Sequence, residues 1–367
     1  MNRETISTTQ AYMLGITSIT VTGHLLFIPV IVNQAGRDAW LSLLVAAVPA
    51  LLTGWIVSSL SRLFPGQTLV DYCESIAGKW VGKALALTFL FFFFHHSALA
   101  IRGFGEFFTS AITPRTPIVV YFAAIVILAV YAVKSGLEVL ARTNAIFLVI
   151  MIPIGLLASV LTHREKDYAN FLPVLENGPG PMLEGALNLI ALFSTFFVLS
   201  MVFPHVNETA KLRRGSVLTM LVLVVMFIGP VTGPVALFGG ERAMGMSYPT
   251  FQMLRDIQVA ELQRLDIIAI LLWSLGSFAK VSLYLFAVSY GLSRVLEFED
   301  YRFIVAPIGA LLVIFSLLVS DNYVDVYRFL QYVHPVYTVF IELALPAALL
   351  AAAYAKLAYA RKRGVRP

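Results

Sequence analysis

Four ionisable side chains lie inside stretches of sequence that are otherwise apolar: Arg102, Glu106, Lys280 and Glu342. A charged group at the centre of a membrane span costs about 2.5–3.5 kcal/mol on insertion scales, so each one needs a partner or a water-filled cavity. Arg102 and Glu106 are four residues apart, which puts both on one face of a helix and favours an intramembrane ion pair. Such a pair either joins helices or has a gating or ligand-facing role.

Lys280 lies near the middle of its apolar segment. Small or polar residues accompany it there: Ser274, Gly276, Ser277 and Ser282. Its ammonium group either takes the place of a bound cation or pairs with an acid such as Glu342 and fixes helix packing. Glu342 is correspondingly either the partner of Lys280 or a neutral carboxyl in apolar surroundings, with proton relay as the alternative. Both residues are therefore candidates for coupling.

His95 and His96 precede Arg102 in the same segment. Because adjacent residues face different sides of a helix, we expect one to line a polar interior and the other to pack. No carboxylate or thiol accompanies them at ligand spacing, so no metal site and no cofactor is predicted. The single cysteine, Cys73, permits neither an internal disulfide nor a Cys-rich metal site.

Two apolar segments have polar or small residues at their centres. These are Thr22, Gly23 and His24 in one segment, and Ser194 and Thr195 in the other. Pro29 follows the first group and Pro204 the second. Helices that unwind at such places free backbone N–H and C=O groups for a polar ligand, which is typical of transporter sites. The alternative is that these residues only pack or kink the helices.

The composition requires a membrane. Of the 367 residues 59% are apolar and only 13% charged, with a mean hydropathy of +0.83. Soluble domains carry about 25% charged residues, so an ordinary soluble enzyme is excluded. The formal charge of +5 reflects basic residues concentrated on one side of the bilayer, so nucleic-acid binding is not predicted. The loops contain no nucleophile–base pair, phosphate loop or nucleotide motif, and we do not expect an enzyme.

Ten apolar blocks of membrane-spanning length predict ten transmembrane helices. They lie near 11–34, 39–61, 82–110, 117–134, 139–162, 182–203, 214–238, 265–293, 302–320 and 334–358. Segments near 67–80 and 322–333 are expected at the interface as short amphipathic pieces. Lys and Arg are twice as frequent in the segments on the N-terminal side as on the other, which places both termini in the cytoplasm. We expect one polytopic membrane domain over 1–367, with a basic tail at 359–367.

Several short motifs occur in a fixed order along the chain. They are 22–29 (TGHLLFIP), 34–40 (QAGRDAW), 172–175 (LPVL), 178–181 (GPGP), 248–250 (YPT) and 264–266 (RLD). In these motifs and in the ten-span layout the sequence resembles the B-subunits of spore-germination receptors, which belong to the amino acid-polyamine-organocation permease superfamily. The likeness extends over nearly the whole chain.

This resemblance implies an inverted repeat of five plus five helices, about 11–162 and 182–358, with helices one and six broken. It also implies a pocket for a small nutrient germinant at mid-bilayer between spans one, three, six and eight, and partner subunits of A and C type. Sodium-coupled members of the superfamily bind a cation between span eight and the break of span one. Lys280 could replace that cation, as a lysine from another span does in proton-coupled or uncoupled relatives.

The sequence departs from the family pattern at both expected breaks. Family members often have Gly-x-Gly in the first break, where this chain has Thr22, Gly23 and His24. Many have Gly-x-Glu in span six, where this chain has Phe196 and Phe197 followed by valine. We expect these phenylalanines to flank the apolar part of the ligand in a bulkier pocket, so a typical amino-acid ligand does not follow from the resemblance.

The sequence thus predicts the membrane subunit of a nutrient-germinant receptor in the inner membrane of a spore-forming bacterium. The alternative is a secondary transporter of amino acids or amines, proton-coupled or uncoupled. Both would hold a polar ligand group on backbone N–H groups near Thr22 to His24. They differ in whether the conformational change drives partner subunits or moves the solute.

Overall fold

The computed structural model describes residues 4–256 and 266–362, and its regular structure is helical throughout. The α-helices are α1 (Thr8–Thr22), α2 (Ile28–Ala35), α3 (Ala39–Leu63), α4 (Leu69–Ala77), α5 (Lys79–Phe107), α6 (Ile118–Lys134), α7 (Leu137–Leu161), α8 (Pro179–Ser194), α9 (Leu212–Phe238), α10 (Gly240–Met244), α11 (Pro249–Asp256), α12 (Asp266–Val295), α13 (Arg302–Leu318), α14 (Tyr323–Arg328), α15 (His334–Val339) and α16 (Leu345–Lys362). Within the described residues no strand forms, and one isolated bridge joins Ile6 to Val206.

Shorter turns connect or interrupt these helices. Four are π-helical: η1 (Gly23–Phe27), η3 (Phe108–Ile112), η9 (Phe329–Val333) and η10 (Phe340–Ala344). The others are 3₁₀ turns: η2 (Gly36–Asp38), η4 (His163–Glu165), η5 (Tyr168–Phe171), η6 (Thr195–Met201), η7 (Phe203–His205) and η8 (Thr209–Lys211). Three of these π-turns, η1, η9 and η10, lie inside long helical segments and change the helix register without ending the helix, whereas η3 is the last turn of the segment that begins with α5.

The prediction of an all-helical membrane protein is confirmed. Among the described residues, seven helical segments are long and apolar enough to cross a membrane, and α6 and α13 are shorter apolar helices. Each predicted span overlaps a helix, while the five-plus-five inverted repeat stays a prediction. The 264–266 motif and the basic tail at 359–367 extend beyond the described residues.

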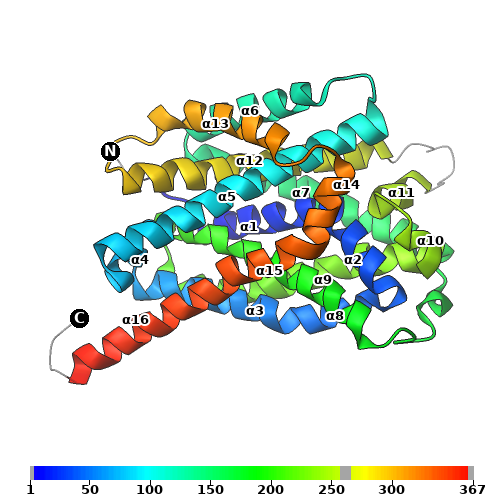
Figure 1. Cartoon of the computed structure of the whole chain (residues 1–367), viewed down its shortest axis with the longest axis horizontal. Helices are drawn as coiled ribbons and strands as arrows, with labels where there is room; N and C mark the ends of the chain where they lie inside the picture. The colour runs from blue at the N-terminus through cyan, green and yellow to red at the C-terminus, as the bar shows by residue number, and fades with distance from the viewer. Residues whose placement is uncertain (1–3, 257–265, 363–367) are drawn as a thin grey trace.

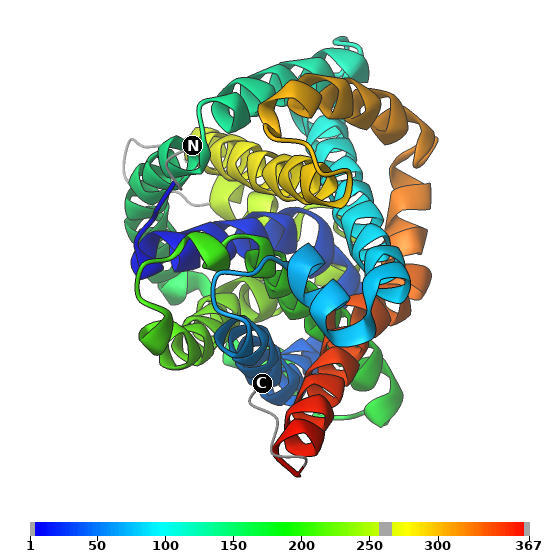
Figure 2. The ribbon, with the colours of Figure 1, turned by 90° about the vertical axis from the view of Figure 1, so that its left-hand side faces the viewer.

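The long helices run side by side along the longest axis of the molecule (Figure 1). The beginning of α1 and the end of α16 lie at one end of the bundle, here called the termini end, and α10 and α11 lie at the opposite end, here called the cavity end. Helix α1 is interior and contacts α7, α9 and α12 (Figure 2). Helix α5 packs along α12 and also contacts α6 and α13.

Each π-turn in the described chain ends two residues before a proline. The residue directly before that proline donates its backbone N–H to the carbonyl five positions back, as from Ile28 to Gly23 and from Leu345 to Phe340. Thr113 and His334 make the equivalent bonds. Proline lacks an N–H, and its ring collides with the carbonyl four residues earlier, so widening the turn relieves the collision. Five prolines within α-helices do not have this effect: Pro49, Pro153, Pro230, Pro234 and Pro307.

The predicted breaks appear as changes of helix type. Span one is not unwound at Thr22 to His24, because η1 continues the hydrogen-bonded helix from α1 into α2. Span six changes from α8 into the 3₁₀ turn η6 at Thr195. The segment at 322–333 is also not a separate interfacial piece, because α14 and η9 begin the long segment that continues through α16.

The chain before α1 forms a strap across the termini end. The Glu4 carboxylate accepts hydrogen bonds from the Leu137 backbone N–H (2.6 Å) and from Arg302 (2.7 Å). His205 Nδ1 lies 3.1 Å from the Glu4 carbonyl oxygen, and the Ile6 N–H donates to the His205 carbonyl (3.0 Å). The strap therefore ties the start of span one to α7, α13 and the loop after span six.

Candidate functional site

The predicted residues of span one face α8 and α9. The Gly23 N–H donates to Ile19 and Thr20 within the helix, so it is not free for a ligand, contrary to the sequence-based hypothesis. A Cβ on Gly23 would collide with the ring of Phe227, and the same ring meets His24 edge-on with centroids 5.7 Å apart. Thr22 bonds the Ser18 carbonyl at 3.4 Å. Glycine is therefore needed at position 23 for close helix packing.

In span six the two hydroxyl groups bond their own helix. Ser194 donates to Ile190 (2.8 Å) and Thr195 to Leu192 (2.6 Å). Such bonds to the preceding turn loosen an α-helix, in agreement with the change to a 3₁₀ turn at this point. They also occupy the single proton of each hydroxyl, so these side chains can offer a ligand only an acceptor oxygen.

The two phenylalanines of η6 point in different directions. Phe196 lies against Gly15 of span one and forms an edge contact with Phe203. Phe197 packs against Phe89 at 5.0 Å and Phe93 at 6.1 Å, both on α5. Only Phe197 therefore lies on the side of span three, and the seven predicted ligand residues do not form one cluster.

Lys280 lies in the interior among aromatic and polar side chains. It is 2% exposed, and its Nζ lies 5.3 Å from the ring centroid of Tyr284, one turn further along α12. Phe93 and Tyr284 form an edge contact with their ring centroids 5.8 Å apart. Because Phe93 also packs against Phe197, this contact links Lys280 to Phe197. A desolvated ammonium over an aromatic face is stabilised by the ring quadrupole, by about 2 kcal/mol.

Glu342 is 1% exposed and lies in η10 of span ten. It belongs to the same interior region as Lys280, yet no N–O contact within 4.0 Å joins the two side chains, which are both in the described chain. Both carboxylate oxygens are buried without a hydrogen-bond partner. A buried polar group without a partner costs several kcal/mol, so this arrangement is not explained by stability.

Two histidines join the same interior region. His96 Nε2 lies 3.1 Å from His334 Nε2, and the two rings stack with centroids 5.0 Å apart. Thr338 Oγ1 lies 3.1 Å from the same nitrogen of His334. His96 also stacks on Tyr284 at 6.2 Å. We call Phe197, His96, Lys280, Tyr284, His334, Thr338 and Glu342 the central cluster.

His95 faces away from this cluster and packs against Phe315, Phe329 and Tyr337. The two adjacent histidines thus divide between a polar interior and an aromatic surrounding, as the sequence suggested. No group of three or more His, Cys, Asp or Glu side chains in the described residues is arranged to hold a metal ion.

Arg102 and Glu106 form an ion pair within α5, in which Arg102 Nε donates to Glu106 Oε1 at 2.9 Å. Both residues are buried. Ser110 lies one turn further along and donates to the Glu106 carbonyl at 2.6 Å. The hydroxyl groups of Ser110 and Tyr248 lie 3.3 Å apart and cover the pair on the side of the cavity end.

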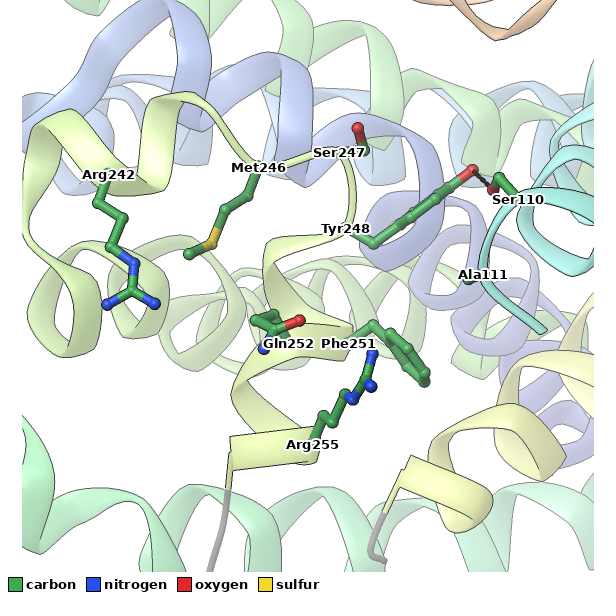
Figure 3. Close-up of a pocket in the computed structure, with 9 residues that line it drawn as sticks. All are labelled: Ser110, Ala111, Arg242, Met246, Ser247, Tyr248, Phe251, Gln252 and Arg255. Atoms are coloured by element: carbon green, nitrogen blue, oxygen red, sulfur yellow. Dashed lines mark hydrogen bonds between the residues drawn. The ribbon is translucent and has the colours of Figure 1, made fainter.

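Two open cavities, each of about 350 Å³, lie at the cavity end. The first is lined by residues of α10, α11 and η3, among them Arg242, Tyr248 and Arg255 (Figure 3). The second lies beside it, includes Arg37, and shares Arg242 with the first. Burial raises the pKa of Tyr248 to about 12, so its hydroxyl is neutral at physiological pH.

A family profile described as "Spore germination protein" matches residues 5–324. The chain belongs to this spore germination family. Spore germination protein KB of Bacillus subtilis (strain 168) is 25% identical over 296 residues, covering 79% of each chain. Spore germination protein XB of Bacillus anthracis is 22% identical, covering 88% of this chain and 90% of its own. The resemblance seen in the sequence is thereby confirmed.

Among solved structures, this spore germination protein is similar to MhsT in complex with L-phenylalanine. The TM-score is 0.69 at 15% identity, covering 96% of this chain and 89% of MhsT. The two chains therefore share a fold. Family and fold are those of permeases rather than of a known enzyme family.

Sequence analysis of this family member missed His334, Thr338 and Tyr284. For His334 and Thr338 the sequence offered one signal, Pro335 directly after His334, and the structure shows a π-turn before it as before three other prolines in the described chain. Such π-turns occur frequently at functional sites because they redirect side chains. Tyr284 had no such signal, because its position depends on how α12 faces α5.

Proposed function

We propose that this chain is the membrane subunit of a nutrient-germinant receptor, with both termini in the cytoplasm of a spore-forming bacterium. It binds a small molecule from outside at mid-membrane and transmits a conformational change to A-type and C-type partner subunits in the inner membrane. The observation that carries the proposal is the family match across residues 5–324.

The central cluster supports a small amphoteric ligand with an apolar part. Phe197 and Phe93, which packs beside the cluster, offer aromatic surfaces, while the Lys280 ammonium and the Glu342 carboxylate offer opposite charges. An amino acid has complementary groups: a carboxylate for Lys280, an ammonium for Glu342 and a side chain for the rings. Because all these groups are buried, binding must accompany a change of conformation, and it shifts that equilibrium only by its differential affinity.

The binding test uses the purified chain in phospholipid nanodiscs and the twenty amino acids, starting with L-phenylalanine because MhsT was solved with it. Phe197→Ala should weaken binding of the best ligand by about fivefold, the effect of losing aromatic contacts worth about 1 kcal/mol. The matched control is Phe122→Ala, a fully buried ring beside Gly105 on the far side of α5. Equal weakening in both variants would remove Phe197 from the site.

Lys280 and Glu342 are proposed as the coupling pair, Lys280 in place of a bound cation. If they only fix helix packing, Lys280→Met and Glu342→Gln should each destabilise the protein, and the double substitution should recover part of the loss. If they couple binding to the conformational change, ligand response is lost in all three variants even where the protein folds. If Lys280→Met leaves the ligand response and folding unchanged, the coupling role is ruled out. Lys83→Met, at a half-exposed ion pair with Glu297, is the control.

A secondary transporter of amino acids or amines is the second candidate, favoured by the MhsT-like fold. Vesicles that contain this chain alone separate the two functions. A transporter accumulates the solute or exchanges it across the membrane, with or without a proton gradient. A receptor subunit binds without net flux, and the response of spores to the nutrient then requires the partner subunits.

A further inference from the structure

The first cavity at the cavity end is basic. Arg242 and Arg255 line it, together with the hydroxyl groups of Ser110 and Tyr248 and the carboxamide of Gln252 (Figure 3). None of its lining residues is acidic. The nearest acids in sequence are Glu241, which lines the neighbouring cavity, and Asp256, which is held by the Gln252 amide at 2.7 Å.

Within the described residues, neither guanidinium group is neutralised by a carboxylate, because no acid there lies within 4.0 Å of Arg242 or Arg255. The Arg242 guanidinium carbon lies over the Phe238 ring, 5.3 Å from its centroid. By contrast, Arg37 in the adjacent cavity pairs with Glu176 at 3.1 Å. The two unpaired arginines therefore keep their donors available for an external anion.

The walls of this cavity are fixed by packing. Tyr248 meets Phe107 edge-on at 5.2 Å, and the Tyr323 hydroxyl donates to the Ser247 carbonyl at 2.9 Å. Phe251 packs against Phe107 and Trp273, both in the interior of the bundle. Beneath the contact between Tyr248 and Ser110 lies the buried Arg102–Glu106 pair.

Guanidinium groups bind carboxylate and phosphate oxygens through paired, charge-assisted hydrogen bonds. A volume of about 350 Å³ lies at the small end of ligand pockets. We propose that this cavity is a binding site for a small oxyanion, held by Arg242 and Arg255. The occupant is a soluble carboxylate or phosphate, or the phosphate of a lipid headgroup, and these share the same chemistry. This site rests on the proposed function only for the side of the membrane that the cavity faces.

The test uses inorganic phosphate as the probe and the purified chain in maltoside micelles, which contain no phosphorus. Binding broadens the ³¹P NMR line of phosphate in proportion to the bound fraction. We expect clear broadening with the wild type and a loss of at least about tenfold in affinity with Arg242→Gln or Arg255→Gln, because each removes a charge-assisted interaction. Arg115→Gln, an exposed arginine in the loop at the same end, should keep the wild-type broadening.

Two competition arms identify the source of the oxyanion. Reversal of the broadening by sodium acetate assigns the site to soluble carboxylates, and reversal by added phosphatidylglycerol at the same ionic strength assigns it to lipid headgroups. The proposal is overturned if the wild type gives no broadening, or if both arginine variants broaden the line as the wild type does. Since the probe is phosphate and no nutrient is present, these outcomes do not depend on whether the germinant response is found.

Discussion

The two ends of the bundle are closed in different ways. At the termini end, Glu4 bonds residues of α7 and α13, while Arg294 pairs with Asp71 at 2.8 Å and Lys356 donates to the Ser75 carbonyl at 2.7 Å. At the cavity end Arg37 pairs with Glu176 at 3.1 Å, but α10 and α11 cover the bundle through hydroxyl contacts such as that of Tyr248 with Ser110, and both cavities open there.

This difference indicates the direction in which the protein is easier to open. Hydrogen bonds to charged groups that are partly buried contribute about 1.5–3 kcal/mol each, exposed ion pairs about 0–1 kcal/mol, and a bond between two hydroxyl groups about 1 kcal/mol. The two partly buried bonds of Glu4 therefore hold the termini end more firmly than the Tyr248 contact holds α10 and α11. A ligand arriving at the cavity end would meet the weaker barrier, which agrees with the proposed binding of a nutrient from that side.

The largest effect is expected from Glu4→Ala. The substitution leaves Arg302 and the Leu137 N–H without their partner, so opening of the termini end should become easier by about 3 kcal/mol. Hydrogen exchange should accelerate about a hundredfold at residues 5–12 and at Leu137. The control is Glu208→Ala at the exposed ion pair with Lys211, where little change is expected. Unchanged exchange in Glu4→Ala would contradict the role of the strap.

A smaller effect is expected from Gly136→Ala. Gly136 has φ +102°, and a Cβ there would lie 2.6 Å from Glu4 Oε1. Gly78→Ala is the matched control, because Gly78 has φ +83° with nothing within 4 Å of its Cβ. Backbone strain should destabilise both variants by about 1–3 kcal/mol, but Gly136→Ala should also displace Glu4 and therefore be destabilised further. The difference in destabilisation between Gly136→Ala and Gly78→Ala is measured by thermal unfolding, and it should vanish when both are made in a Glu4→Ala background. A difference that persists there has another cause.

Tyr248→Phe should loosen the cavity end by about 1 kcal/mol by removing the hydroxyl contact with Ser110. The wild type should also show a pH dependence that the variant lacks. Burial raises the pKa of Tyr248 from 10.0 to about 12, so its neutral form stabilises the fold below pH 10 and that stabilisation is lost as the pH rises towards 12. Hydrogen exchange at residues 249–256 measures both effects, and identical profiles for the two proteins would refute them.

The smallest effect concerns Cys73, a reporter on α4 at the termini end. Burial, and secondly the charge of Glu74, raise the pKa of its thiol to about 12, so only roughly one molecule in ten thousand carries a thiolate at pH 8. Labelling by a maleimide should be slow in the wild type and in Glu4→Ala, because α4 is held by Asp71 and Ser75 instead. Arg294→Ala should accelerate labelling. Rapid labelling of the folded wild type would show that this end is open.

The local sequence predicted the positions at which the long helices change geometry. It did not predict which type of turn forms there. Polar residues and Pro29 marked the middle of span one, but an unwound segment was expected and a π-turn formed. The hydrogen bond from Ile28 to Gly23 shows why: a wider turn accommodates the proline and keeps the backbone paired, which is required inside lipid. The 3₁₀ turn at Thr195 has the same consequence for span six.

The site was less predictable than the fold. Lys280 and Glu342 were recognised because isolated charges in apolar segments are conspicuous, and Arg102 and Glu106 because of their spacing. His334 and Tyr284 were not, since His334 is only the first residue of the tenth predicted span, next to the segment expected at the interface, and Tyr284 is an ordinary aromatic residue of an apolar helix. Their contacts with His96 join three helices that are far apart in sequence.

By itself, the sequence determined that this chain is a helical membrane protein of the spore germination family, because hydrophobic length and motif order are properties of consecutive residues. Only the tertiary structure decided which side chains meet: Phe197 rather than Phe196 faces α5, and two arginines line an open cavity. The reason is rotational. Each π or 3₁₀ turn rotates the rest of its helix relative to a regular α-helix, and helix packing selects the face that each residue presents.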